Sequence, residues 1–295
     1  MIDMACIEQK TDFNFLNWNK VVGSYTLSQL QASGVPSVCD NITPEPQGWN
    51  ISTAAFLASF SVAAEDTIPA DVFMKPDGSK AYLVGSNNKS VYEYDVTNWN
   101  ITTAVINQNY NPSQPISAIY FKPDGLKMYL LASPNIREYD LSTAWDVSTS
   151  VFNQKYNAVA QGQQSSIFFR SDGLKMYTSS TTSETIEEYT LSRAWDVSSL
   201  SPTHSFSVTT WETSAFTVFF KTNGERMYVL GFTGSILYEF NLSIAWDVRT
   251  AVISQNFDAS AQDTSPIGFF IRDDGLKMYL TGSANDSIYE YDLTD

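Results

Sequence analysis

The fold is decided by the stretch Phe121-Lys122-Pro123-Asp124-Gly125-Leu126-Lys127-Met128-Tyr129-Leu130, which is followed by Ile136-Arg137-Glu138-Tyr139-Asp140. Related stretches surround four further Asp-Gly or Asn-Gly pairs, at Asp77-Gly78, Asp172-Gly173, Asn223-Gly224 and Asp274-Gly275. Consecutive pairs lie 47, 48, 51 and 51 residues apart. A nearly constant period of this size indicates a repeat architecture, here with five units.

Each unit predicts four antiparallel strands. A short apolar strand, A, leads into the Asp-Gly turn, where glycine supplies the positive φ, and Lys-Met-Tyr-Leu forms strand B. The tyrosine-rich segment that ends in Tyr139-Asp140 in the second unit is strand C, and strand D follows a tryptophan. The tryptophans, each followed 11 residues later by an aromatic residue, are Trp49, Trp99, Trp145, Trp195 and Trp246, with Phe60, Tyr110, Tyr156, Phe206 and Phe257. We expect these tryptophans to pack between the units, with their indole N–H groups hydrogen-bonded.

The order of the strands along the chain predicts how the units are closed. Four strands per repeat of about 40–50 residues is typical of a β-propeller blade. The repeat region begins with a D strand, 49–60, and ends in a C strand, 289–293. We therefore predict an all-β fold: a five-bladed β-propeller of four-stranded antiparallel blades over 49–295, closed by the N-terminal outer strand 49–60. Such closure leaves no exposed sheet edge.

Residues 1–48 do not match the repeat, and we interpret them as an N-terminal arm that anchors the protein to a partner. They contain Cys6 and Cys39, which are expected to be free thiols rather than a disulfide because residues 1–20 lack a secretory signal. No apolar run approaches 18 residues, so no membrane insertion is predicted. The net charge of −15 argues against a nucleic-acid partner.

The loops that join strand D to strand A, and B to C, should share one face of the propeller. They vary between units, and variable loops on a rigid scaffold are common binding sites. Our candidate ligand-binding residues lie there: Trp211, Glu212, Phe232, Asp66 and Asp263. The three acids occupy matching positions and either bind a cation or sugar hydroxyls, or cap turns.

Two sets of charged residues recur with the repeat. A basic residue in strand B and a glutamate in strand C should face each other, and we interpret these pairs as structural. They are Lys80 and Glu93, Lys127 and Glu138, Lys175 and Glu188, Arg226 and Glu239, and Lys277 and Glu290. A second basic set either forms an anion-binding ring at the mouth of the central channel or pairs with nearby acids. It consists of Lys75, Lys122, Arg170, Lys221 and Arg272.

Catalytic residues are not predicted. The single histidine, His204, argues against histidine-based catalysis and against His-rich metal sites. A glycosidase needs converging carboxylates, but strand A carries only Asp71, with Ser117, Ser166, Thr217 and Gly268 at the positions that we take as corresponding. We therefore expect no enzyme activity, no metal and no cofactor.

The stretches Lys-Pro-Asp-Gly-Leu-Lys-Met-Tyr and Tyr-Asp-Leu-Ser-Thr-Ala-Trp-Asp-Val-Ser-Thr resemble the β-propeller repeats of surface-layer-type proteins and of marine phage or bacterial proteins. The resemblance covers residues 49–295. The architecture is also similar to tryptophan–aspartate repeat propellers, although their Gly-His element is missing, and to lectins of the tachylectin-2 type. The resemblance implies a protein that binds rather than catalyses.

Together these observations favour a non-enzymatic phage virion protein of the tail or fibre type. The arm, 1–48, would dock on other virion proteins, and the propeller would serve as a structural platform or bind a glycan or protein receptor on the host. The predicted location is the virion. A free, extracellular, lectin-like propeller is the alternative, and a glycosidase or lyase is the third hypothesis.

Overall fold

A computed structural model describes residues 48–158, 160 and 162–294. The chain divides into two units, Met1–Pro46 and Gln47–Asp295. The predicted arm, including Cys6 and Cys39, lies outside the described residues apart from Gly48. Among the described residues, no helix is long and apolar enough to cross a membrane.

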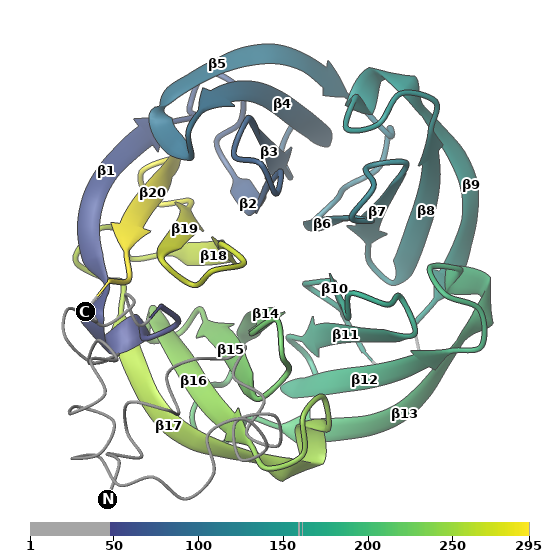
Figure 1. The fold of residues 1–295 in the computed structure, drawn as a ribbon, viewed down its shortest axis with the longest axis vertical. Helices are drawn as coiled ribbons and strands as arrows, with labels where there is room; N and C mark the ends of the chain where they lie inside the picture. Colours follow the sequence, from purple (N-terminus) through teal and green to yellow (C-terminus); the bar gives the residue numbers. More distant parts are fainter. Residues whose placement is uncertain (1–47, 159, 161, 295) are drawn as a thin grey trace, which may run out of the picture. The chain divides into compact units, whose positions relative to one another are not determined.

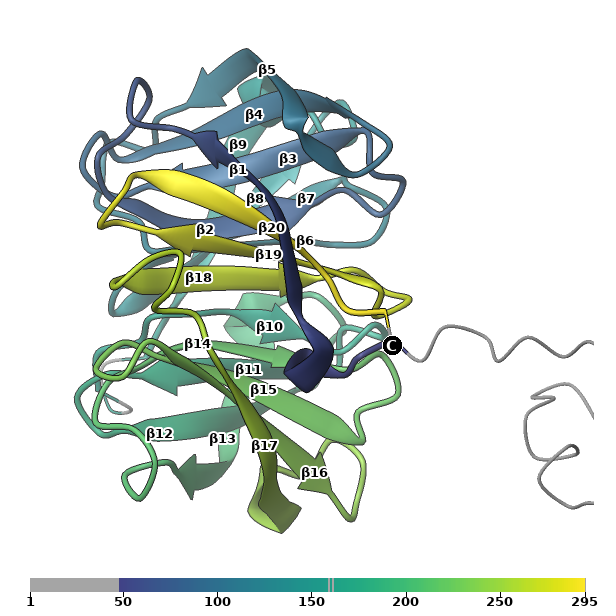
Figure 2. The same cartoon turned by 90° about the vertical axis from the view of Figure 1, so that its left-hand side faces the viewer.

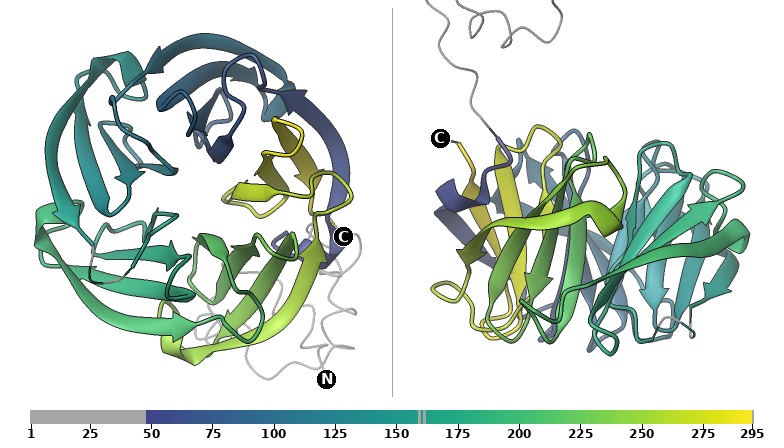
Figure 3. Two further views of the ribbon diagram at one scale, coloured as in Figure 1. Left: turned by 180° about the vertical axis from the view of Figure 1, so that it is seen from behind. Right: turned by 90° about the horizontal axis from the view of Figure 1, so that it is seen from below.

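The second unit is a five-bladed β-propeller, as the repeat predicts (Figure 1). Each blade is a four-stranded antiparallel sheet with strand A nearest the axis and strand D outermost (Figure 3). Blade 1 contains β2 (Pro69–Met74), β3 (Lys80–Gly85), β4 (Ser90–Thr97) and β5 (Asn100–Tyr110). Blade 2 contains β6 (Ala118–Phe121), β7 (Lys127–Ala132), β8 (Asn135–Leu141) and β9 (Ser150–Asn157). Blade 3 contains β10 (Phe168–Phe169), β11 (Lys175–Ser180), β12 (Thr185–Leu191) and β13 (Leu200–Ser207). Blade 4 contains β14 (Ala215–Phe220), β15 (Arg226–Gly231), β16 (Ile236–Leu242) and β17 (Ala251–Asp258).

Blade 5 closes the ring with the strand that comes first in the sequence. It contains β18 (Pro266–Ile271), β19 (Lys277–Gly282), β20 (Ser287–Asp292) and β1 (Ala55–Ser61). Strand β1 pairs with β20 from Ala55 opposite Asp292 to Ser61 opposite Ser287 (Figures 1 and 2). The predicted closure is confirmed, although the strand starts at Ala55 rather than Trp49, because the 3-10 turn η1 (Ile51–Thr53) precedes it. The same turn recurs as η2 (Val147–Thr149), η4 (Val197–Ser199) and η5 (Val248–Thr250).

A ring of five aromatic side chains surrounds the propeller axis. One residue comes from the A strand of each blade: Phe73, Tyr120, Phe168, Phe219 and Phe270. Neighbouring ring centroids around this circle are 5.0–5.7 Å apart, with interplanar angles of 63–74°. Edge-to-face packing of this kind stabilises aromatic pairs beyond simple burial. The centre of the propeller is therefore packed at this level, and we name this set the aromatic ring.

The tryptophans before the D strands form the corners between blades. Each has a left-handed backbone, with φ between 63° and 74°. The indole of Trp145 lies against Gly125, where an added Cβ would be 2.3 Å from Nε1, so the turn requires glycine both for its φ of +72° and for space. The Tyr82 hydroxyl of blade 1 donates a hydrogen bond of 2.7 Å to the Trp145 main-chain oxygen of blade 2.

Equivalent tyrosine-to-tryptophan bonds join all five pairs of neighbouring blades. The other four run from Tyr129 to Trp195, Tyr177 to Trp246, Tyr228 to Trp49 and Tyr279 to Trp99. The predicted packing of the tryptophans between blades is confirmed, and in these bonds the main-chain oxygen, rather than the indole N–H, is the tryptophan's hydrogen-bonding group. The aromatic residue 11 positions later packs edge-to-face on the C strand of the next blade, with centroids 5.4–6.0 Å apart.

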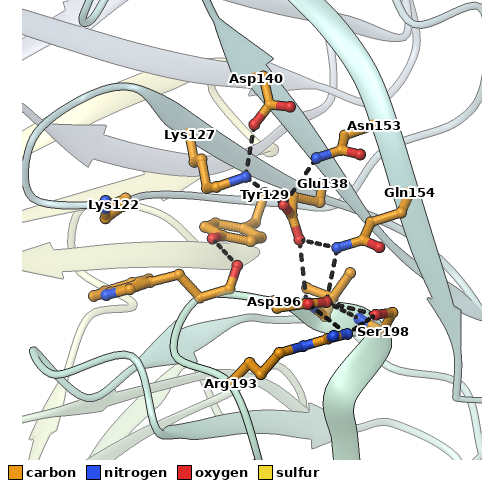
Figure 4. Close-up of polar contacts among 12 residues, drawn as sticks. Lys122, Lys127, Tyr129, Glu138, Asp140, Asn153, Gln154, Arg193, Asp196 and Ser198 are labelled. Atoms are coloured by element: carbon orange, nitrogen blue, oxygen red, sulfur yellow. Dashed lines mark hydrogen bonds and ion pairs between the residues drawn. The ribbon is translucent and has the colours of Figure 1, made fainter.

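The recurrent glutamates also join neighbouring blades (Figure 4). The Lys127 ammonium contacts the Glu138 Oε1 at 2.5 Å, as predicted. The two residues are diagonal rather than directly opposed, however, because the register places Lys127 opposite Asp140 and Glu138 opposite Tyr129. Glu138 is buried, and its second oxygen accepts hydrogen bonds from Gln154 at 2.9 Å and from the Val197 N–H of blade 3 at 3.1 Å. The pair therefore belongs to a buried inter-blade network.

Candidate functional site

The three loop acids Asp66, Glu212 and Asp263 are buried at 1–3% exposure. Asp263 Oδ1 accepts hydrogen bonds from the Ser265 and Ala284 N–H groups, and its Oδ2 accepts from Asn285 and from the Tyr289 hydroxyl. Asp66 binds the N–H groups of residues 68, 87 and 88 in the same way, and Glu212 those of residues 213, 214 and 233. Each acid therefore ties the D–A loop that enters its blade to the B–C loop of that blade. These contacts support the turn-capping interpretation rather than a ligand contact.

A glycine at the end of strand B makes room for each of these acids. An added Cβ would lie 2.0–2.3 Å from a side-chain atom of the acid at Gly85, Gly231 and Gly282. Blades 2 and 3 have Ala132 and Ser180 at this position and no acid in the matching place of the loop. This coincidence of glycine and acid was visible in the sequence, and it is the signal that identifies the acids as structural.

Trp211 packs against aromatic side chains of two blades. Its ring lies 6.0 Å from Phe206 of blade 3 and 5.2 Å from Phe240 of blade 4. Its main-chain oxygen accepts a hydrogen bond of 2.8 Å from the Tyr238 hydroxyl. The side chain is half-buried between two blades. This geometry favours a role for Trp211 in packing between blades 3 and 4.

Phe232 is exposed on the loop face, at 38% of its surface, and contacts Phe216 with ring centroids 5.0 Å apart. The positions equivalent to Phe232 hold small polar residues in the other blades, namely Ser86, Ser133, Thr181 and Ser283. Those equivalent to Phe216 are Ala70, Ser117, Ser165 and Ile267. The hydroxyls of Thr213 and Thr233 lie 3.1 Å apart on the flanking loops. We name Phe216 and Phe232 the aromatic pair of blade 4; the repeat does not require it.

The basic residues of the opposite face are mostly paired. Lys75, Lys122, Arg170 and Arg272 each contact the aspartate two residues later, at 2.6–2.7 Å. Lys221 has Asn223 at that place and forms no ion pair with a described residue. None of the five lines the cavity at the mouth of the channel. Four of the five therefore follow the local-pairing interpretation, and they do not form a ring of free cations.

That cavity, the axial pocket, lies on the side of the A–B turns. Its volume is about 170 Å³. The aromatic ring forms its floor, and Trp145 and Trp246 contribute to its walls. The rim consists of the residue before each turn Asp or Asn: Pro76, Pro123, Ser171, Thr222 and Asp273. This pocket is not apparent from the sequence, because its lining residues come from all five repeats and meet only when the ring of blades is closed.

Glu188, His204 and Asp247 form the one cluster in the described part of the chain with the types and spacing of metal ligands; one candidate ligand atom from each lies within 4.8 Å of the others. The Glu188 carboxylate already contacts Lys175, and Asp247 contacts Arg249 at 2.7 Å. His204 occupies the place of Gln108, Gln154 and Gln255, whose amide groups bridge the equivalent residues of other blades. We interpret the cluster as a variant of the inter-blade network rather than a metal site.

Asp71 is a buried carboxylate inside the channel. Its oxygens accept hydrogen bonds from the Val72 N–H at 2.9 Å and from the Ile119 N–H of blade 2 at 3.0 Å. Burial raises its pKa to about 7 despite these bonds. The equivalent residues are Ala118, Ser166, Thr217 and Gly268, so the position predicted as Ser117 is corrected by one residue. None of these is a second carboxylate of the kind that a glycosidase needs.

Comparisons with known proteins support the fold alone. No family model matches the chain, and no curated protein is similar to it in sequence. The β-propeller domain of Cps50 (Swd1) from Myceliophteria thermophila is similar in structure, with a TM-score of 0.50 and 9% identity, over 82% of this chain and 100% of that one. A candidate 6-phosphogluconolactonase from Bacteroides uniformis has a TM-score of 0.50 and 12% identity, over 76% of this chain and 66% of its own length. A functionally unknown protein from Desulfotomaculum acetoxidans has a TM-score of 0.46 and 11% identity, over 72% and 62%. The chain thus spans slightly less than two thirds of the length of the last two proteins.

Proposed function

We propose that this chain is a non-enzymatic phage virion protein of the tail or fibre type, whose propeller binds a host receptor through the aromatic pair of blade 4. The observation that carries the proposal is the exposure of Phe232 beside Phe216, at positions where the other blades hold small or non-aromatic residues. Contiguous exposed apolar patches are typical of interaction surfaces.

The surroundings of the aromatic pair suit a sugar ring or an apolar side chain of a receptor. The two adjacent rings offer an apolar contact, and the Thr213 and Thr233 hydroxyls on the flanking loops offer hydrogen bonds. The buried Glu212 holds both loops through its three backbone hydrogen bonds. A preorganised surface of this kind loses little conformational entropy on binding.

The virion role rests on the resemblance of the repeats to those of phage proteins and on the expected docking of residues 1–48 on other virion proteins. Mass spectrometry of purified particles of the phage that carries the gene should detect peptides from both 1–48 and the propeller. Their absence from purified particles, with the protein free in the lysate, would favour the alternative of a free lectin-like protein.

Receptor binding is tested with Phe232→Ser, which installs the residue that blades 1, 2 and 5 carry. Adsorption of the labelled full-length protein to host cells, or to a glycan array, should fall about tenfold or more, because hot-spot aromatics dominate binding energy. The melting temperature should stay near that of the wild type, since the side chain is exposed.

The matched control is Leu126→Ser. Leu126 is 45% exposed in an A–B turn of the opposite face, and blade 1 has Ser79 at that place. This variant should adsorb like the wild type. Equal adsorption by the Phe232→Ser protein would overturn the assignment of the aromatic pair.

A further inference from the structure

The axial pocket lies on the face opposite the aromatic pair of blade 4, and its chemistry differs from that of the rest of the propeller. Its volume of about 170 Å³ is comparable to that of apolar protein cavities that admit a benzene-sized guest. Most of its lining is aromatic. A guest therefore has to present a compact group that is compatible with π-systems.

The aromatic ring places five π-systems around one point on the axis. Its neighbouring centroids are 5.0–5.7 Å apart. The ring forms the floor of the pocket, so a positive group in the pocket lies above the rings and not at their centre. Cations are attracted to aromatic faces within about 6 Å of the ring centroid, so a positive group that rests on this floor is within reach of several of the five rings.

The charge of the pocket also favours a cationic guest. Asp273 is the one charged residue among the described residues that line it. The residue before it, Arg272, contacts Asp274 at 2.6 Å, and its guanidinium lies 5.5 Å from the centroid of Trp99, so it is engaged elsewhere. Asp273 forms no ion pair with a described residue. Partial desolvation and the Asp274 carboxylate raise the pKa of Asp273, as expected for an acid without a cationic partner.

The sequence sets Asp273 apart from its equivalents. The rim positions of the other blades are Pro76, Pro123, Ser171 and Thr222, which carry no charge. The turn acids next to the rim, including Asp77 and Asp124, are engaged with Lys75 and Lys122. The pocket therefore combines an aromatic floor with a single uncompensated carboxylate at one point of its rim.

We propose that the axial pocket binds a small organic cation, an alkylated ammonium group, whose alkyl substituents contact the aromatic ring and whose charge lies beside Asp273. The aromatic ring and the Asp273 carboxylate both stabilise a bound organic cation. A neutral apolar guest is stabilised only by the aromatic ring, and an anion is stabilised by neither. This site is independent of the proposed receptor-binding function, because the two use opposite faces of the propeller.

The experiment titrates the full-length protein with choline chloride. Trp145 and Trp246 line the pocket, so tryptophan fluorescence reports occupancy, and isothermal titration calorimetry gives the dissociation constant. The uncharged isostere 3,3-dimethyl-1-butanol should bind about tenfold more weakly or worse, because it lacks the charge. Sodium sulfate, the probe for an anion site, should produce no saturable signal.

Two variants that each remove one negative charge separate a local from a general electrostatic effect. Asp273→Asn should weaken choline binding about tenfold. Asp286→Asn, on the B–C loop of the opposite face, should change it less than about twofold because salt screens distant charges. The proposal is overturned if the neutral isostere binds as tightly as choline, if Asp273→Asn has no effect, or if choline does not saturate the protein up to about 50 mM.

Discussion

The two faces of the propeller use their buried polar groups in different ways. Near the A–B turns, tyrosine hydroxyls and glutamate carboxylates reach across to the next blade, as Tyr82 does to Trp145. On the loop face, Asp66, Glu212 and Asp263 bind only the loops of their own blade. The tyrosine-to-tryptophan contacts involve residues of the repeat and recur around the whole ring, whereas the loop acids occur in blades 1, 4 and 5. Blades 2 and 3 lack the loop acid, and the loop face is accordingly the variable one.

The largest effect is expected from removing β1, which breaks one junction of the ring. Deletion of residues 1–61 exposes the edge of β20 and removes the Trp49 oxygen that Tyr228 binds. We expect aggregation and loss of cooperative thermal unfolding, because an unpaired edge strand promotes association. Deletion of residues 1–47 leaves all five blades complete and is the control. Similar melting curves and solubility for the two proteins would show that the closure does not stabilise the ring.

The next largest effect is expected from removing a carboxylate that joins two blades. Glu138→Ala leaves Lys127 and the Val197 N–H without their buried partner, and we expect a loss of about 3–5 kcal/mol in the free energy of unfolding in urea. Asp140→Ala removes the other, exposed partner of the same lysine and should cost less than about 1 kcal/mol. Equal losses would mean that burial between the blades adds nothing to the pair.

Asp71 also joins two blades, and it makes this junction sensitive to pH. The Asp71 carboxyl group holds its proton more tightly in the folded protein than in the unfolded chain, since folding raises the pKa of Asp71 from 3.8 to about 7. The stability that it contributes is therefore full below pH 3.8 and is lost as the pH rises through about 7. The loss amounts to up to about 4 kcal/mol.

The matched variant is Asp71→Ser, because Ser166 accepts the same inter-blade hydrogen bond, from the Val218 N–H. The wild type should lose unfolding free energy relative to the variant as the pH rises from 4 to 8. A difference that stays constant over that range would show that Asp71 is ionised throughout.

A smaller and local effect is expected on the loop face. Asp263→Ala leaves the Ser265, Ala284 and Asn285 N–H groups without their acceptor, at a cost of about 1–3 kcal/mol. Hydrogen exchange should accelerate in the two loops of blade 5 and remain unchanged in blades 2 and 3. Faster exchange throughout the ring would contradict the distinction between the two kinds of contact.

The smallest expected effect is an increase in the free energy of unfolding. His204→Gln restores the bridging amide that Gln108 supplies between Glu93 and Asp146. We expect an increase of about 0.5–1.5 kcal/mol in stability, because a hydrogen bond is added inside an existing network. A less stable variant would show that the histidine has a role of its own beside Glu188.

Much of the fold could be predicted because the same strand pattern recurs in each repeat. The Asp-Gly spacing identifies the blades, and the strand order identifies β1 as the closing strand. The diagonal offset between Lys127 and Glu138 was missed, because a constant spacing fixes the face of a strand but not the register of the hairpin. The packing of Trp211 between blades 3 and 4 could not be predicted, because a residue outside the repeat has no equivalent for comparison. The axial pocket depends on all five blades and has no signature in any single one.

The pairing of β1 with β20 has a mechanical consequence. Ala55 lies opposite Asp292, so the chain segments that leave this pair do so at the same end. Tension applied between those segments would separate the hydrogen bonds one after another, from Ala55 toward Ser61, instead of loading them all together in shear. The segment before β1 is also held by blade 4, because Tyr228 binds the Trp49 oxygen. A stretched propeller is therefore expected to open first at this junction between blades 4 and 5 and then along the seam of blade 5.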